Sequence, residues 1–180
     1  DGCYIKGRAN SSGAQYFNRT ICSRRSTDGG ASWGAAATKL FSPHVFAANP
    51  SAAWDPVRQR VVLVFDNTQD GGIMLSMSSD LGVSFSDPVP ARLANQSHII
   101  AFAGPGNNVL VLPTGVIVFA GYAHWRNYST QQPTFWSNVY LSLDGGVSWS
   151  QDGPTFLHLG EPSLALLQGG EIILDARCPD

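Results

Sequence analysis

Short runs of apolar and β-branched residues recur along the chain, and each run is bounded by glycine, proline, asparagine or aspartate. Six runs have the length and composition of β-strands: Arg60–Phe65, Gly72–Met77, Val109–Leu112, Val116–Phe119, Val139–Ser142 and Glu171–Leu174. The segments Leu112–Val116 and Leu167–Glu171 contain the glycine that hairpin turns need for positive φ. No apolar stripe of helical period is long enough for a helix. The pattern therefore predicts an all-β protein built from antiparallel hairpins.

One eight-residue pattern occurs three times: serine, aspartate, glycine, serine and an aromatic residue, with one variable residue between each of the first four. The copies are Ser26 to Trp33, Ser78 to Phe85, and Ser142 to Trp149. Their acids, Asp28, Asp80 and Asp144, lie 52 and 64 residues apart. This spacing is close to that of a four-stranded propeller blade with its loops. The repeat therefore predicts a β-propeller.

The residue types of the pattern describe a turn that satisfies its own polar groups. The aspartate is expected to accept hydrogen bonds from turn amides, and the glycine to adopt a conformation that a side chain disfavours. The aromatic ring is expected to pack back onto the blade. The glycines are Gly30, Gly82 and Gly146, and the rings are Trp33, Phe85 and Trp149. The serines that open the three copies are Ser26, Ser78 and Ser142. We interpret the pattern as structural.

Composition narrows the classes of ligand. The 180 residues carry a formal charge of −2, and only 13% are charged, so neither a nucleic-acid footprint nor a cationic membrane face is expected. No apolar run approaches the roughly 18 residues of a transmembrane segment, and the first residues contain no apolar signal-peptide core. An uncharged or weakly charged ligand suits this composition.

The cysteines, histidines and sequons bear on disulfide bonds, metal binding and secretion. The three cysteines, Cys3, Cys22 and Cys178, leave open a Cys3–Cys22 or a Cys3–Cys178 bridge. Neither they nor His44, His98, His124 and His158 have metal-site spacing, so no metal or cofactor is predicted. Sequons begin at Asn10, Asn18, Asn95 and Asn127, as in secreted or lumenal proteins.

The three repeats resemble the Asp boxes found in the six-bladed propellers of the sialidase (neuraminidase) superfamily. The stretch Arg24–Trp33 resembles that family's first box together with the basic pair that precedes it. Gly104-Pro105-Gly106 and the hairpin after it resemble its GPG segment. The stretch Gly160–Arg177 resembles its Asn-Glu…Asn-x-Arg stretch. The resemblance implies that residues 1–180 are a partial sialidase-like propeller domain, about three blades of a six-bladed ring.

The resemblance also implies two site residues. Glu161 corresponds to the family's base partner of a nucleophilic tyrosine, and Arg177 to one of three arginines that hold the sialic acid carboxylate. A neutral tyrosine suits an anionic substrate, because a carboxylate nucleophile would be repelled. A guanidinium matches a carboxylate in bidentate fashion. The expected partner is a sialylated glycan, cleaved with retention; the tyrosine and the other arginines are expected outside this chain.

One family feature is missing. The segment from Arg8 to Ser26 contains no acid, and Gln15 stands where the family's acid/base aspartate is expected; an amide cannot protonate a leaving group. Two alternatives therefore stay open: a catalytically inactive propeller that binds glycans, and a propeller that serves assembly. An exposed ion pair is the structural alternative for Glu161 and Arg177.

Other patterns are assigned to structure or to binding. Gly30–Gly34 matches the nucleophile elbow of serine hydrolases, but it lies inside a repeated turn without the following helix. Asp55 and Asp66 are interpreted as turn acids. An aromatic cluster that follows the Gly104-Pro105-Gly106 hairpin could form a sugar-facing rim: Tyr122, His124, Trp125, Tyr128 and Trp136.

Overall fold

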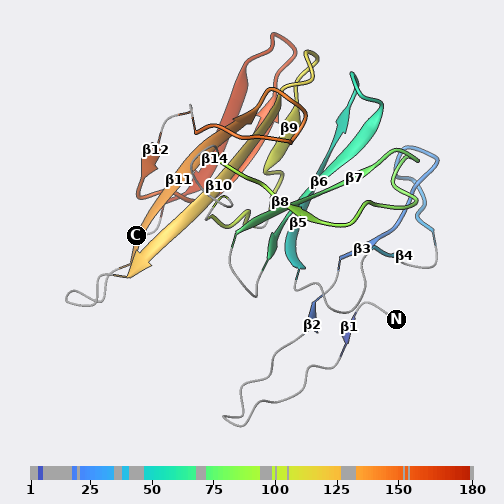
Figure 1. Cartoon of the computed structure of the whole chain (residues 1–180), viewed down its shortest axis with the longest axis horizontal. Helices are drawn as coiled ribbons and strands as arrows, with labels where there is room; N and C mark the ends of the chain where they lie inside the picture. The colour runs from blue at the N-terminus through green and yellow to red at the C-terminus, as the bar shows by residue number, and fades with distance from the viewer. Residues whose placement is uncertain are drawn as a thin grey trace.

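The structure is a computed structural model that describes residues 4–5, 18–19, 21–34, 38–40, 47–67, 72–93, 99, 101–104, 106–126, 133–151, 153 and 155–178. The regular elements of this part of the chain are antiparallel β-strands (Figure 1). Among these residues no helix is long and apolar enough to cross a membrane. The predicted all-β class is confirmed.

Two sheets contain four strands each, hydrogen-bonded in chain order. The first comprises β5 (Ala47–Asp55), β6 (Arg60–Asn67), β7 (Ile73–Ser78) and β8 (Val89–Pro90). The second comprises β9 (Val109–Val111), β10 (Ile117–Arg126), β11 (Pro133–Ser142) and β12 (Thr155–Leu157). A strand order that follows the chain is the meander of a propeller blade.

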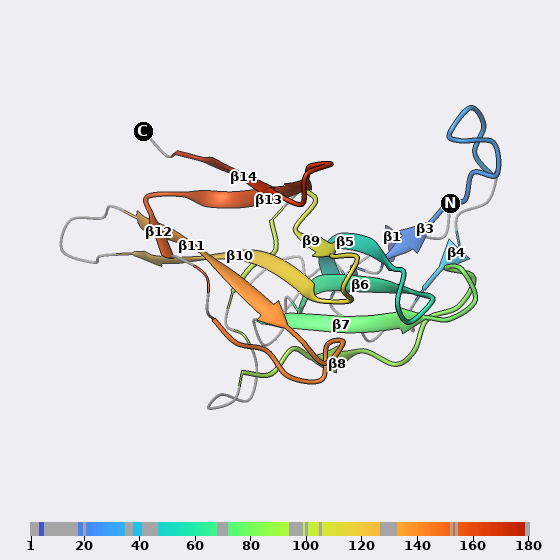
Figure 2. The same cartoon turned by 90° about the horizontal axis from the view of Figure 1, so that it is seen from above.

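Three two-stranded sheets complete the described part. They pair β13 (Gly160–Leu166) with β14 (Ile172–Arg177), β3 (Cys22–Ser23) with β4 (Thr38–Lys39), and β1 (Tyr4–Ile5) with β2 (Asn18–Arg19). The leading strands β5, β9 and β13 contact one another in that order. In Figure 2 the β13–β14 pair lies against the sheet that contains β9 and β10. Successive sheets therefore stack face to face, with their first strands side by side.

Alternation along the central strands fills the space between the sheets. On β6, Val62 and Val64 belong to the core shared with the second sheet, whereas Leu63 and Phe65 belong to a core with Ile21. On β10, Ile117 faces the first of these cores, while Val118 and Ala120 pack with Leu164 of β13. Both faces of these strands are buried, which explains why they are continuously apolar in the sequence.

All six predicted strand runs coincide with strands, but two long strands were not predicted. β5 contains Pro50 and β13 contains Pro162, and proline normally argues against a strand because it lacks an N–H group. The register of each strand shifts around its proline, between Ala48 and Ser51 in β5 and between Gly160 and Ser163 in β13. These β-bulges accommodate the prolines.

The three repeats form the same hydrogen-bonded turn. The first serine donates to the aspartate, at 2.7 Å in Ser26, 2.7 Å in Ser78 and 2.9 Å in Ser142. The hydroxyl of that serine accepts from the glycine N–H, at 2.7, 2.8 and 2.7 Å. The aspartate accepts from the N–H and hydroxyl of the serine four residues later in every copy. Each turn therefore satisfies its own polar groups.

These bonds stabilise the charged form of the three acids. Hydrogen bonds from Ser32 and Ser26 hold the pKa of Asp28 well below its ordinary value, and the pKa of Asp80 is lowered in the same way. Burial acts to raise the pKa of Asp144, but hydrogen bonds from Ser148 outweigh it and lower the pKa to about 2. The turns therefore stay ionised in moderately acidic solution.

The aromatic residue of the repeat behaves differently from copy to copy. Trp149 is 3% exposed and meets Phe119 edge to face, with ring centroids 6.4 Å apart. Phe85 packs against the core that contains Phe65. Trp33 is 61% exposed, so the expectation that every ring packs onto a blade is wrong for the first copy. The turn itself does not depend on its ring, because all of its hydrogen bonds come from the other residues.

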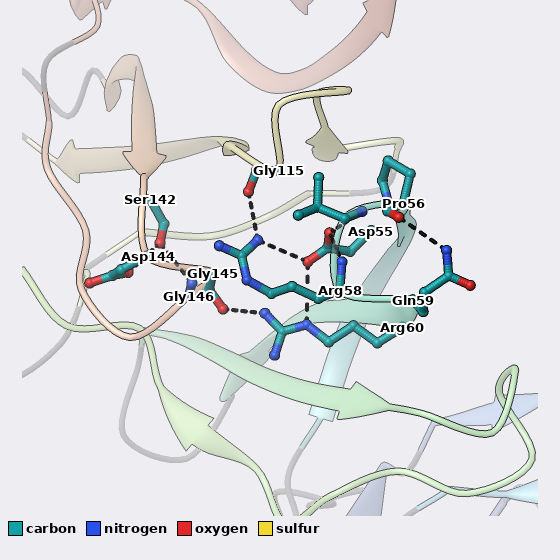
Figure 3. A network of polar contacts seen from close by, with 11 residues as sticks. Asp55, Pro56, Arg58, Gln59, Arg60, Gly115, Ser142, Asp144, Gly145 and Gly146 are labelled. Atoms are coloured by element: carbon teal, nitrogen blue, oxygen red, sulfur yellow. Dashed lines mark hydrogen bonds and ion pairs between the residues drawn. The ribbon is translucent and has the colours of Figure 1, made fainter.

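A buried acid joins the first two sheets at the end where the repeats lie (Figure 3). Asp55 accepts from the backbone N–H of Arg58 at 3.0 Å and pairs with the guanidinium groups of Arg58 and Arg60 at 3.2 and 3.3 Å. The two arginines continue to the second sheet, donating to the carbonyls of Gly115 at 2.9 Å and Gly145 at 2.6 Å. Asp55 is the turn acid that was predicted, and it also links two blades.

Only some of the cysteines and sequons are among the residues that the structure describes. Cys22 forms a disulfide, and Cys178 is an exposed thiol; Cys3 lies outside the described residues. Asn18 lies on β2, whereas Asn10, Asn95 and Asn127 are also outside the described part. Of the two bridges considered, the assignment of Cys22 to a disulfide favours the one that includes it.

Candidate functional site

Glu161 and Arg177, predicted as site residues 16 positions apart, form an ion pair. Arg177 Nε lies 3.1 Å from Glu161 Oε2 across the start of β13 and the end of β14. The Arg177 side chain is 63% exposed and the Glu161 side chain 29%, so the guanidinium remains accessible to a ligand. The third repeat begins at the end of β11, beside the β9–β10 turn, whereas the pair lies at the open end of the β13–β14 hairpin, away from its turn. The pair is therefore at the opposite end of the sheets from the repeated turns.

The backbone of Glu161 has an unusual conformation. Its φ is +54°, in the left-handed region that residues with a Cβ rarely adopt. Glu161 and Pro162 together oppose one residue of β14, since Gly160 pairs with Arg177 and Ser163 pairs with Asp175. A bulge of this kind redirects a side chain out of the regular alternation. Strain of this kind in a charged residue is typical of functional positions.

Tyr122 of β10 belongs to the same group. A Cβ added to Gly104 would lie 3.1 Å from Glu161 Cα and 3.2 Å from Tyr122 Cε1, so all three residues meet at one point. Burial and the negative charges of Glu161 and Asp66 raise the pKa of Tyr122, while Arg177 acts in the opposite direction. Tyr122 is therefore a neutral phenol, able to donate a hydrogen bond.

The aromatic cluster predicted around Tyr122 is divided between two faces of its sheet. Trp136 pairs with Ala123, the neighbour of Tyr122, and therefore lies on the opposite face. His124 and Trp125 lie on β10, and Tyr128 is outside the described residues. The expectation of one rim containing both Tyr122 and Trp136 is wrong, because strand alternation separates them.

Asp66 was interpreted as a turn acid, and this is wrong. It lies within β6, is 1% exposed, and accepts from Ala103 N at 2.6 Å and from Asn49 Nδ2 at 2.7 Å. Burial raises the pKa of Asp66 to about 6, although both hydrogen bonds act to lower it. Asp66 therefore holds the side-chain amide of Asn49, and both carboxylate oxygens of Asp66 accept hydrogen bonds.

A sequence signal for these residues exists, although it was not recognised. Each leading strand is entered through a residue of positive φ followed by proline: Asn49 at 49°, Gly104 at 77° and Glu161 at 54°. The three positions are 55 and 57 residues apart, close to the blade repeat. Because the leading strands lie side by side, these positions converge. Asn49 therefore occupies in the first blade the place that Glu161 occupies in the third.

Metal and acid candidates do not add to the site. In the described part of the chain no three His, Cys, Asp or Glu residues are grouped to hold a metal ion. His158 is exposed, whereas His44 and His98 lie outside that part, as does Gln15, the residue at the position expected for the acid. The site therefore consists of one ion pair, one phenol and an amide held by a buried carboxyl group.

Two solved sialidase structures are similar to 89% of this chain. A Hadza microbial sialidase superposes with a TM-score of 0.66 at 19% sequence identity. The Trypanosoma rangeli sialidase, solved as a covalent intermediate with 2,3-difluorosialic acid, superposes with a TM-score of 0.56 at 14% identity. The chain covers 36% and 29% of these two structures, about a third of their length. No protein-family profile and no curated protein matches the sequence. The fold is therefore that of a sialidase-type β-propeller.

Proposed function

We propose that this chain contributes to an exo-acting sialidase, a glycoside hydrolase that releases terminal sialic acid from glycoconjugates with retention. The observation that carries the proposal is the pairing of an accessible guanidinium, Arg177, with a carboxylate held on a strained bulge, Glu161. The similarity in fold to two sialidases supports it. The chain covers about a third of those structures, so the activity is proposed for the whole protein.

Arg177 would bind the carboxylate of the sugar. Its side chain is 63% exposed, and the ion pair with Glu161 engages Nε, which leaves the terminal nitrogens to a ligand. A guanidinium presents parallel N–H groups to a carboxylate, whereas an ammonium acts as a point charge. Arg177 therefore supplies orientation as well as charge neutralisation.

Glu161 would act as the base for a tyrosine nucleophile contributed by another part of the protein. As the phenol oxygen bonds to the anomeric carbon, its proton passes to the Glu161 carboxylate, and the glycosidic C–O bond breaks while a general acid from another part of the protein protonates the leaving oxygen. Water then attacks the anomeric carbon and gives a proton to the conjugate base of that acid, and the departing phenol recovers its proton from Glu161. We assign the nucleophile to a tyrosine outside this chain and treat Tyr122 as a neutral phenol, because burial and the neighbouring carboxylates raise its pKa. Tyr122 instead suits a hydrogen bond to a hydroxyl group of the sugar.

The second candidate is a propeller that binds sialylated glycans without cleaving them. The observation that favours it is the acid-free segment from Arg8 to Ser26. Asp66 does not replace the missing acid, because it is 1% exposed and both of its oxygens accept hydrogen bonds. In this alternative Arg177 keeps its role and Glu161 only positions it.

Hydrolysis of a fluorogenic α-sialoside by the full-length protein separates the two. If the protein is a hydrolase, Glu161→Gln should lower kcat by about 10²–10⁴-fold. Arg177→Lys should weaken sialoside binding although the positive charge is kept, because an ammonium does not bind a carboxylate in bidentate fashion. Glu171→Gln is the matched control, since Glu171 is an exposed glutamate on the same hairpin. Binding of a sialoside without hydrolysis would establish the second candidate, and activity indifferent to both changes would refute both roles.

A further inference from the structure

Asn108, directly before the leading strand β9, is hydrogen-bonded to the leading strands of the other two blades, β5 and β13, and also to Ala103 and to β10. It is 0% exposed, and its backbone N–H donates to the hydroxyl of Ser51 on β5 at 2.9 Å. Its carbonyl accepts from Ala120 N at 2.9 Å. The side-chain amide nitrogen donates to the carbonyls of Ala103 and Pro162. One buried residue therefore connects the first, second and third blades.

The two carbonyls that the amide binds belong to the segments that meet at the site. Pro162 is the second residue of the Glu161 bulge, and Ala103 precedes Gly104. Gly104 and Glu161 approach so closely that a Cβ on Gly104 would lie 3.1 Å from Glu161 Cα. Ala103 is also held on its other side, since its N–H donates to Asp66 at 2.6 Å. The Asn108 amide therefore sets the distance between the two segments.

The strained conformation of Glu161 needs such an external restraint. A residue with a Cβ at φ +54° returns to an ordinary conformation unless its neighbours prevent it. Pro162 has no N–H group with which to bind the neighbouring strand. The Pro162 carbonyl accepts a hydrogen bond from Asn108, which restrains the bulge from outside the β13–β14 pair.

A purely structural explanation of Asn108 is less satisfactory. Asn108 Oδ1 is buried and has no hydrogen-bond partner among the described residues. A buried acceptor without a partner is destabilising, and most buried polar atoms in proteins are satisfied. The orientation of the amide is fixed, because reversing it would direct Oδ1 at two carbonyl oxygens. An unfavourable oxygen is retained so that two donors reach Ala103 and Pro162.

We infer that Asn108 is a positioning residue for Glu161, holding the Glu161-Pro162 bulge against Gly104 so that the carboxylate faces the site. This inference rests on the proposed function for its catalytic consequence. Its structural content, that the amide determines the conformation of Glu161, is independent of the reaction. The neighbouring Asn107 provides a comparison, because its amide donates to Leu164 O at 3.0 Å, three residues beyond Glu161.

The experiment compares Asn108→Ala and the isosteric Asn108→Asp with Asn107→Ala in the full-length protein. Mispositioning of a reacting group by about 1 Å lowers the rate by about 10²-fold, so we expect kcat to fall by about 10–100-fold in both Asn108 variants. KM should change by less than about threefold, because Arg177 is untouched. Asn107→Ala should remain within about twofold of the parent.

A double-mutant cycle separates positioning from general loss of structure. In a Glu161→Gln background, Asn108→Ala should change the residual rate by less than about twofold, since the group that it positions is already removed. An equal fall in both backgrounds would overturn the inference. If Asn108→Ala does not fold, the same comparison is made with Asn108→Asp, which leaves no cavity.

A readout without turnover keeps this inference distinct from the proposed function. The carboxyl ¹³C resonance of Glu161, assigned with Glu161→Gln, should move in the Asn108 variants and stay in place in Asn107→Ala. An unmoved resonance overturns the positioning role even if the protein is an active sialidase. A moved resonance in a protein that neither binds nor cleaves sialosides supports the positioning of Glu161 and refutes the proposed function.

Discussion

Replacing Asp55 by alanine is expected to weaken the contact between the first two four-stranded sheets. The Asp55 carboxylate is completely buried and pairs with Arg58 and Arg60, whose side chains are 32% and 22% exposed (Figure 3). Both arginines bind carbonyls of the second sheet, at Gly115 and Gly145. Loss of the acid therefore removes the group that fixes both inter-sheet contacts.

The magnitude follows from the burial of the three side chains. Removing one partner of a fully buried ion pair destabilises a protein by about 3–5 kcal/mol. Because each arginine retains about a fifth to a third of its exposure, water partly solvates the released cations, and we expect a loss of about 2–4 kcal/mol for Asp55→Ala. Asp55→Asn keeps an acceptor for the backbone N–H groups of Val57 and Arg58 and should lose about 1–2 kcal/mol.

Urea denaturation of the full-length protein measures these free energies of unfolding. Asp87→Ala, which removes an exposed acid after the second repeated turn, is the control and should stay within about 0.5 kcal/mol of the parent. The loss in Asp55→Ala should shrink in an Arg60→Ala background, because the two residues are coupled. A loss below about 1 kcal/mol, or equal losses in both Asp55 variants, would refute the reasoning.

Three further predictions concern glycines and a buried acid. Gly145→Ala should destabilise the protein at least about 1 kcal/mol more than Gly29→Ala in thermal unfolding, because both have positive φ but only at Gly145 would the Cβ lie 2.5 Å from an arginine nitrogen; equal effects would contradict this. Gly104→Ala should lower both stability, by about 2–4 kcal/mol, and sialoside turnover, since its Cβ would press on Glu161; an active, fully stable variant would be inconsistent with the site. The pKa of Asp66 is raised to about 6 from 3.8, so the folded state binds its proton more tightly. About 3 kcal/mol of stability present below pH 3.8 should be lost as the pH rises through 6, and Asp66→Asn should abolish that slope in denaturation curves from pH 4 to 8.

Some of the fold could be read from local sequence. The six predicted strands lie in the sheets, and the apolar runs of β6 and β10 reflect burial on both faces, whereas Ile172 and Ile173 of β14 are exposed. The three repeated turns form because every hydrogen bond in them joins residues at most four apart. Such contacts do not depend on the rest of the chain, so residue type and spacing are sufficient to predict them.

Other features depended on contacts between distant segments. β5 and β13 were not predicted, because Pro50 and Pro162 conceal them and the bulges that tolerate these prolines are properties of strand pairing. Asp66 was misjudged because its partners Asn49 and Ala103 are 17 and 37 residues away. Trp33 and Trp149 have the same place in the repeat but opposite exposure, which depends on what packs over each ring.

The candidate site shows the same division. The sequence by itself determined the strand class, the repeated turns and the identity of Glu161 and Arg177 as a candidate pair. Only the tertiary structure decided that this pair meets Tyr122 and Gly104, and that Asn49, held by Asp66, has the corresponding place two blades away. It also decided that Asn108 joins the carbonyls of Ala103 and Pro162. The physical reason is that turns are stabilised by neighbours in sequence, whereas a site at the meeting point of several blades is created by the packing of their leading strands.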